Sequence, residues 1–184
     1  ATWAICSFSS TSTAMARMAS TAAWAPASMP RLRLMGLAPA ATFFIPGHTI
    51  ETYPAVCRAI AEAGHELALH GYAHELNALL SKDDEVAILR RSMGLIESLT
   101  GAPPTGYRAP SGDVTDQTLE LLVDHGLTYD SSLMGHDYQP YRVRTASTFP
   151  SDAPVLWGTE TALVELPWSW TLDDYVYLEF VTFR

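Results

Sequence analysis

Short apolar runs alternate with amphipathic stretches from residue 41 onward, and this alternation limits the folds that the chain can adopt. Thr42–Ile45 and Glu66–Leu69 have the length and residue types of buried strands. The stretch between them has Pro54 where the first turn of a helix would lie and Gly64 where that helix would end. A strand, a helix and a second strand in this order favour a parallel sheet, and therefore an α/β fold.

The same alternation continues toward the C-terminus. Ser81 and the acidic residues after it favour a helix that runs to about Leu99, and a second helix is expected over Thr115–His125. Further strands are expected at Gly106–Arg108, Leu127–Tyr129, Ala162–Leu166 and Val176–Phe180.

Two histidines stand four residues apart directly after the second apolar run. If His70 ends a strand and His74 lies one helical turn further on, both imidazoles can point at one ion. Neutral imidazole is a common zinc ligand, and a third ligand, usually a carboxylate, would come from elsewhere in the chain. The alternative is a core histidine beside a surface one. The spacing therefore makes His70 and His74 candidate metal ligands.

Three motifs, in chain order, resemble those of the polysaccharide deacetylases, a family of metal-dependent amide hydrolases. They are Ala41–Gly47, His70–His74 and Gly106–Pro110. Two later segments, Tyr129–Ser132 and Glu165–Trp168, resemble the branch that includes peptidoglycan-deacetylase-like and allantoinase-like proteins. The resemblance implies an α/β fold of the distorted (β/α) barrel type.

The resemblance also implies roles for particular residues. His70 and His74 would hold a divalent metal, with Zn²⁺ as the first candidate, and Arg108 would orient a catalytic aspartate. Tyr107 and Trp168 would bind substrate. The alternatives are a structural ion pair for Arg108 and buried aromatic packing for Trp168.

The implied function is metal-dependent deacetylation of an N-acetylated carbohydrate such as peptidoglycan, which is hydrolysis of a non-peptide carbon–nitrogen bond. Two alternatives stay open: a hydrolase of a small linear or cyclic amide, as in the allantoinase-like proteins, and a non-catalytic scaffold. The expected partner is an N-acetylated sugar polymer or a small amide, and homo-oligomer formation is left open.

The composition bears on the partners and on the location. With 11 basic and 20 acidic residues the net charge is −9, which argues against nucleic acid and anionic membranes as partners. The sequence shows neither a secretion-signal pattern nor 18 consecutive apolar residues, so a cytoplasmic location is expected.

The N-terminal region departs from the family pattern. Residues 1–50 contain no Asp or Glu, whereas residues 51–184 hold all 20. In the family this region carries a motif whose two aspartates serve as catalytic base and third metal ligand. We therefore expect a single catalytic domain over residues 1–184 in which residues 10–40 are either a flexible extension or the product of a frameshift, and in neither case a packed regular element.

Codon arithmetic supports the frameshift. Codons permitted for Ser10–Ala16, preceded by a T and read one base earlier, encode Phe-Asp-Val-Asp-Gly-Asp-Gly, although other codons for the same serines and threonines would give Asn, His or Tyr in place of Asp. In addition, no histidine follows His136, where the family has its general acid, and this favours a barrel that is incomplete at the C-terminus. The chain as written is therefore expected to be defective as an enzyme.

Overall fold

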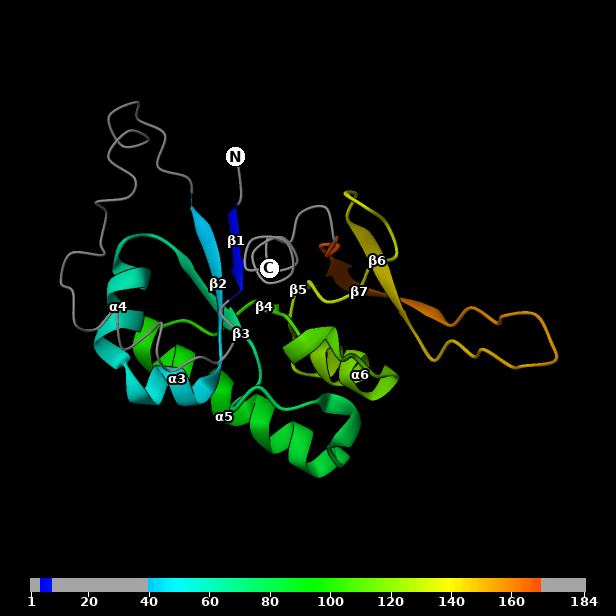
Figure 1. Ribbon diagram of the computed structural model, residues 1–184, viewed down its shortest axis with the longest axis horizontal. Helices are drawn as coiled ribbons and strands as arrows, with labels where there is room; N and C mark the ends of the chain where they lie inside the picture. Colours follow the sequence, from blue (N-terminus) through cyan, green and yellow to red (C-terminus); the bar gives the residue numbers. More distant parts are fainter. Residues whose placement is uncertain (1–3, 8–39, 170–184) are drawn as a thin grey trace, which may run out of the picture. The chain divides into compact units, whose positions relative to one another are not determined.

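The computed structural model describes residues 4–7 and 40–169, and the chain divides into two compact units (Figure 1). The first unit comprises Ala1–Glu75 and Asp83–Pro104, and the second comprises Leu76–Lys82 and Thr105–Arg184. The strand expected at Val176–Phe180 lies outside the described residues, as does all but the last residue of the segment 10–40.

The strands of the first unit are parallel. β1 (Ala4–Ser7) pairs with β2 (Ala41–Ile45), and β2 pairs with β3 (Glu66–Leu69). Every residue of β2 is buried, as expected of an apolar strand with a neighbour on each side. The strands predicted at Thr42–Ile45 and Glu66–Leu69 are confirmed, and so is their parallel arrangement.

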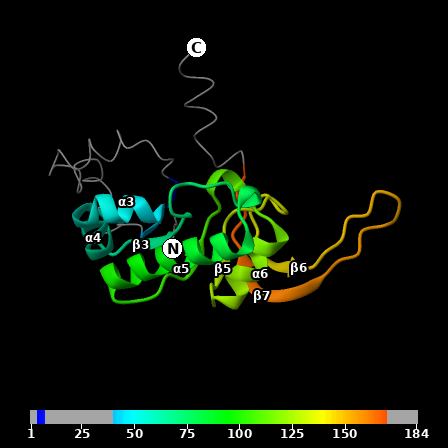
Figure 2. The ribbon, with the colours of Figure 1, turned by 90° about the horizontal axis from the view of Figure 1, so that it is seen from below.

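Three helices accompany these strands in the first unit (Figure 2). They are α3 (Gly47–Thr52), α4 (Pro54–Glu62) and α5 (Lys82–Thr100). Pro54 opens α4, and Gly64, with φ of +87°, follows its end in the left-handed conformation that glycine adopts without strain. Helix α3 was not predicted, because its six residues are too few to show a helical period.

Two glycines of the first unit are expected to respond in opposite ways to alanine. A Cβ at Gly47 would lie 2.8 Å from the Ser92 hydroxyl oxygen and 2.8 Å from a ring carbon of Tyr72, so Gly47→Ala should lower the free energy of unfolding by about 1–3 kcal/mol. A Cβ at Gly94, which is exposed in the middle of α5, would meet no atom within 4 Å, so Gly94→Ala should raise it by about 0.5–1 kcal/mol. Urea unfolding of both variants checks this, and equal midpoints would contradict the close packing at Gly47.

The second unit contains β4 (Gly106–Tyr107), β5 (Tyr129–Asp130) and β7 (Thr159–Glu165), which pair in parallel in that order. Helix α6 (Asp116–Asp124) connects β4 to β5. The described part of the unit also contains two 3₁₀ turns, η1 (Asn77–Leu79) and η2 (Pro110–Gly112), and the strand β6 (Tyr141–Thr145).

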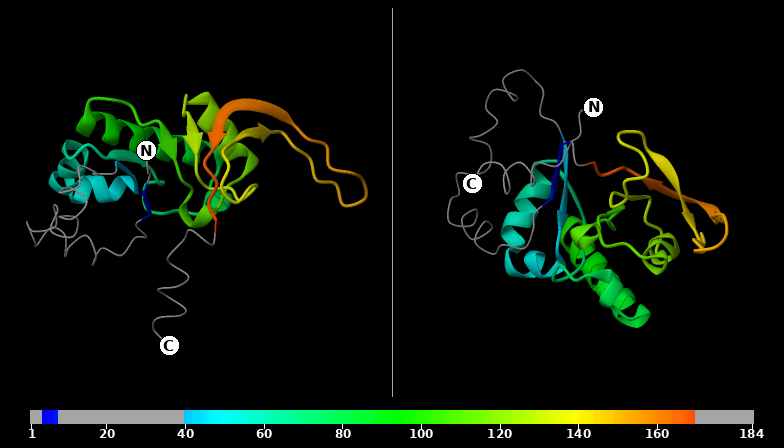
Figure 3. Two further views of the ribbon diagram at one scale, coloured as in Figure 1. Left: turned by 90° about the horizontal axis from the view of Figure 1, so that it is seen from above. Right: turned by 45° about the vertical axis from the view of Figure 1, so that its right-hand side comes forward.

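Strand β6 corrects the prediction of a sheet with parallel strands only. It pairs antiparallel with β7, and the two strands form a hairpin whose connecting loop projects outward (Figure 3). Its sequence alternates exposed Arg142 and Arg144 with buried Val143, which is the pattern of an antiparallel strand with one solvated face. This strand was not predicted, because an alternation over five residues is a weak signal on its own.

Among the described helices, none combines the length and the apolar content that a membrane span requires.

Candidate functional site

The two histidines lie on a tight loop after β3. Strand β3 ends at Leu69, and His70 follows it with only 2% of its surface exposed. Gly71 and His74 have positive φ angles of 67° and 65°. The left-handed conformation of these two residues turns the chain back on itself, so the helical turn expected between the histidines does not form.

Hydrogen bonds from within the first unit fix the shape of this loop. The Glu75 carboxylate accepts from the backbone N–H groups of Tyr72 at 3.0 Å and Ala73 at 2.8 Å. The carbonyl oxygen of Gly71 accepts from the hydroxyl of Ser92, a buried residue of α5, at 3.0 Å. The loop is therefore held both by its own acidic residue and by the helix beside it.

The two imidazole rings are close in space, as the sequence predicts. The ring centroids of His70 and His74 lie 5.0 Å apart, and the ring planes make an angle of 79°. Two imidazoles that bind one ion through nitrogen at about 2.1 Å, at the tetrahedral angle, have centroids roughly 5 Å apart. The pair therefore has the spacing of two ligands of a single metal ion.

Two nitrogen ligands do not complete a metal site. Within residues 4–7 and 40–169, no group of three His, Cys, Asp or Glu side chains is placed to hold a metal ion. The chemistry of the donors suits zinc, but a third ligand has to come from beyond this set. The segment Ser10–Ala16, where the sequence suggests that two aspartates are missing, lies outside the described residues.

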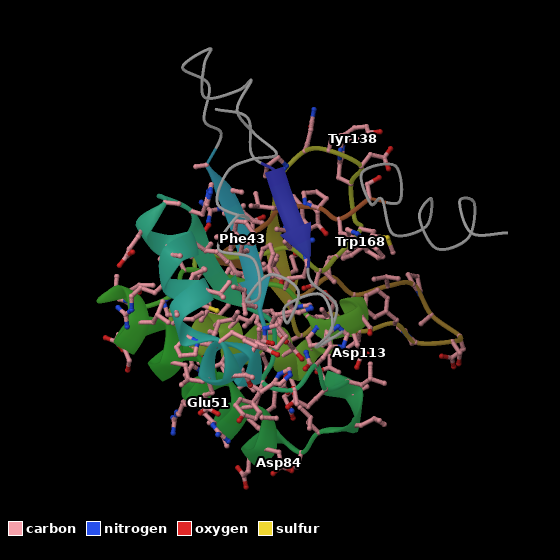
Figure 4. All side chains as sticks on the ribbon, turned by 60° about the vertical axis from the view of Figure 1, so that its left-hand side comes forward. Phe43, Glu51, Asp84, Asp113, Tyr138 and Trp168 are labelled. Carbon is pink, nitrogen blue, oxygen red and sulfur yellow. The ribbon has the colours of Figure 1, made fainter. Side chains whose placement is uncertain are left out.

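A cluster that was not predicted from the sequence surrounds Tyr72, which stands between the two histidines. The hydroxyl of Tyr72 donates to the carboxylate of Glu51 on α3, which is labelled in Figure 4, at 2.7 Å. Glu51 also pairs with Arg91 of α5 at 3.0 Å. The Arg91 guanidinium lies 3.9 Å from the centre of the Tyr72 ring. The hydrogen bond from Tyr72, followed by that from Arg91, lowers the pKa of Glu51. These contacts connect the histidine loop to both helices. They could not be predicted from sequence patterns, because the three residues are far apart in the chain.

Arg108 lies in the second unit, directly after β4. Its Nε donates to the carbonyl oxygen of Ser131 at 2.8 Å, and its Nη2 donates to the Ser131 hydroxyl at 2.6 Å. That hydroxyl in turn donates to the carbonyl oxygen of Leu166 at 2.7 Å. One edge of the guanidinium is thus held by the segments that follow β5 and β7. Ser131 is the partner of Arg108 in both of these hydrogen bonds, and the structural ion pair that the sequence left open for Arg108 stays a prediction.

The two predicted substrate-binding residues also belong to the second unit. Tyr107 is 4% exposed, and its hydroxyl accepts from the side-chain amide of Asn77 at 2.8 Å. Trp168, which is labelled in Figure 4, is half-buried. Its backbone N–H donates to the carbonyl oxygen of Leu133 at 3.0 Å. A contact of either side chain with substrate stays a prediction.

The histidines belong to the first unit, and Arg108, Tyr107 and Trp168 belong to the second. The expectation that both imidazoles converge near Arg108 concerns the two units together, so it also stays a prediction.

The order of strands and helices places the chain in the α/β class, and comparison with known proteins identifies its family. Residues 25–129 match the family model described as polysaccharide deacetylase, so the chain belongs to the polysaccharide deacetylase family, whose members are metal-dependent. The sequence-based assignment of family and fold class is confirmed.

One curated relative and two solved structures illustrate the similarity. The chain is 41% identical over 151 residues to a peptidoglycan deacetylase of Helicobacter pylori, covering 77% of this chain and 52% of the relative. A Mycobacterium smegmatis structure assigned to the polysaccharide deacetylases is 41% identical with a TM-score of 0.59, covering 74% of this chain and 43% of that one. The structure of Puue allantoinase has a TM-score of 0.62 at 21% identity, covering 81% of this chain and 44% of that one, which shows a common (β/α) barrel-like fold and no more.

The chain spans about half the length of the curated relatives that it matches.

Proposed function

We propose that this chain belongs to a metal-dependent deacetylase that removes acetyl groups from an N-acetylated glycan of the peptidoglycan class. The observation that carries the proposal is the pair of imidazoles whose centroids are 5.0 Å apart at the end of β3. The substrate class rests on the 41% identity over 151 residues to a protein named peptidoglycan deacetylase.

In this proposal, His70 and His74 donate their ring nitrogens to a divalent ion, with Zn²⁺ as the first candidate because zinc combines readily with imidazole and carboxylate ligands. The ion, when bound, supplies Lewis acidity toward the amide carbonyl and toward water. The loop around Gly71 pre-arranges the two rings, since its turn is fixed by Glu75 and Ser92.

Arg108 is proposed to orient a carboxylate that acts as the catalytic base. A guanidinium group is planar and presents several N–H donors in fixed directions, so it can hold a carboxylate in one orientation. The two hydrogen bonds to Ser131, at 2.8 and 2.6 Å, restrict the rotation of the Arg108 side chain. Tyr107 and Trp168 are proposed to contact the sugar.

Acetate release tests the proposed function. The chain as written should release no measurable acetate from N-acetylglucosamine oligomers or peptidoglycan, because loss of a catalytic base alone typically costs about 10²–10⁴-fold in rate. A variant in which Ser10–Ala16 is replaced by Phe-Asp-Val-Asp-Gly-Asp-Gly should release acetate slowly in the presence of ZnCl₂. This release should stop with EDTA and in the same variant carrying His70→Ala.

The same assay separates the two alternatives from the proposal. Turnover of allantoin without acetate release from glycans would replace the proposal with the small-amide hydrolase. Tight binding of the glycan oligomers by the aspartate-containing variant, with no turnover of either substrate, would favour the non-catalytic scaffold.

A further inference from the structure

Two acidic side chains are completely buried in the second unit, and the proposed deacetylation uses neither of them. Asp130 ends β5 and Glu165 ends β7, and the two residues are direct partners in the parallel pairing of these strands. Both are 0% exposed. Buried carboxylates are rare unless each oxygen has a partner or the charge is neutralised.

One oxygen of each carboxyl group has a hydrogen-bond donor. Asp130 Oδ1 accepts from the Ser132 hydroxyl at 2.6 Å, and Glu165 Oε1 accepts from the backbone N–H of Leu133 at 3.0 Å. The second oxygens, Asp130 Oδ2 and Glu165 Oε2, are buried, and none of the residues that the structure describes donates to them. If both groups were ionised, two like charges would stand side by side with an unsatisfied oxygen each.

We propose that Asp130 and Glu165 share a single proton, carried by Glu165 and donated from its Oε2 to Asp130 Oδ2. One proton satisfies both orphan oxygens and leaves the pair with one negative charge instead of two. The two residues are paired across neighbouring strands, and each of the two carboxyl groups has one of the oxygens that lack a donor. Burial, followed by the charge of Asp130, raises the pKa of Glu165 to about 9, and burial also raises the pKa of Asp130.

Two ionisable side chains near the pair, Tyr141 and Arg108, bear on how the charge of the two carboxyl groups is neutralised. Tyr141 of β6 adds no positive charge, and its own pKa is raised by burial and by the charges of Glu165 and Asp130. Arg108, after β4, directs its Nε and Nη2 to Ser131. In the described part of the chain, no third acidic, histidine or cysteine side chain completes a cation site with the pair.

Hydrogen bonds through Ser132 connect the pair to the segment that contains Arg108. The Ser132 hydroxyl donates to Asp130 and accepts from the backbone N–H of Ala109, the residue after Arg108, at 2.8 Å. The shared proton therefore stabilises a series of contacts that runs from β7 through β5 to the residue next to Arg108, the proposed positioning residue.

The protonation state of the pair sets the direction of a pH effect. Because the pKa of Glu165 is raised from 4.5 to about 9 in the folded protein, the folded state keeps a proton that the unfolded chain releases. The stabilisation is complete below about pH 4.5 and is lost as the pH rises toward 9. A glutamine at position 165 would supply a permanent N–H donor to Asp130 and would remove this dependence.

Infrared spectroscopy of the full chain tests the proposal without any activity assay. At pH 7, wild type should show the carbonyl band of a protonated carboxylic acid, which is distinct from the carboxylate bands. Glu165→Gln should lack this band, and Glu120→Gln should keep it, because Glu120 is an exposed acid of the same unit. The melting temperature should fall between about pH 5 and pH 9 in wild type and in Glu120→Gln, and markedly less in Glu165→Gln.

Absence of the acid band from wild type at pH 7 would overturn the proposal, whatever the variants do. A melting temperature of wild type that rises on addition of CaCl₂ or MgCl₂, with only carboxylate bands present, would identify a cation in place of the proton. Persistence of the band in Glu165→Gln would assign the proton to another group. None of these outcomes bears on deacetylation, so failure of this inference is distinguishable from failure of the proposed function.

Discussion

Replacing His70 by alanine is expected to abolish measurable zinc binding, a loss of more than about 100-fold in affinity. Loss of a group that only supports a metal ligand typically costs 10–100-fold, and His70→Ala removes one of the two proposed ligands outright. The same loss is expected for His74→Ala, because the two rings, 5.0 Å apart, would bind the same ion. Isothermal titration calorimetry with ZnCl₂ measures both affinities.

His136→Ala is the matched control for these two variants. His136 is exposed, and its Nδ1 accepts from the backbone N–H groups of Tyr138 at 3.2 Å and Gln139 at 3.1 Å, so its removal should leave zinc affinity unchanged. If all three variants bound zinc as wild type does, the histidine pair would not be the metal site.

Supplying the aspartates that the family pattern calls for should have the largest effect in the opposite direction. Replacement of Ser10–Ala16 by Phe-Asp-Val-Asp-Gly-Asp-Gly is expected to tighten zinc binding by about 100-fold or more, because a carboxylate would complete a site that has two imidazole ligands. The neutral hydroxyls of the serines and threonines now present are poor zinc ligands.

The control for this replacement is the same segment with asparagine at its first two aspartate positions. It should bind zinc as weakly as the chain as written, since an amide carries no negative charge. Equal affinities of the aspartate variant and the chain as written would show that this motif does not contain the missing ligand.

Local signals were sufficient to predict the elements that present the candidate site. The strands β2 and β3 follow from apolar runs of four or five residues, and α4 follows from Pro54 at its start and Gly64 after its end. The capped start of α6 at Thr115 is of the same kind, because Thr115 accepts from the backbone N–H of Thr118 at 3.1 Å. Each of these signals lies within the element that it predicts or within two residues of its end.

Features that depend on contacts between distant segments were not predicted. The left-handed turn at Gly71 and His74 is held by Ser92, which is 21 residues from Gly71 in the chain. The buried pair of Asp130 and Glu165 depends on the pairing of β5 with β7, and its two residues lie in motifs that the sequence assigned only to a family branch. The spacing of His70 and His74 was sufficient to identify them as candidate metal ligands. The conformation of the loop that brings their rings together could not be predicted from the sequence.

The central claim is that His70 and His74 bind one metal ion, and imidazole NMR during a titration with ZnCl₂ tests it most directly. This measurement suits the chain as written, because it detects weak binding and resolves the histidines individually. We expect the ring signals of His70 and His74 to move together and to saturate at one equivalent of bound zinc, while those of His125 and His136 stay in place. Equal movement of all six histidines, or movement of neither His70 nor His74, would contradict the claim.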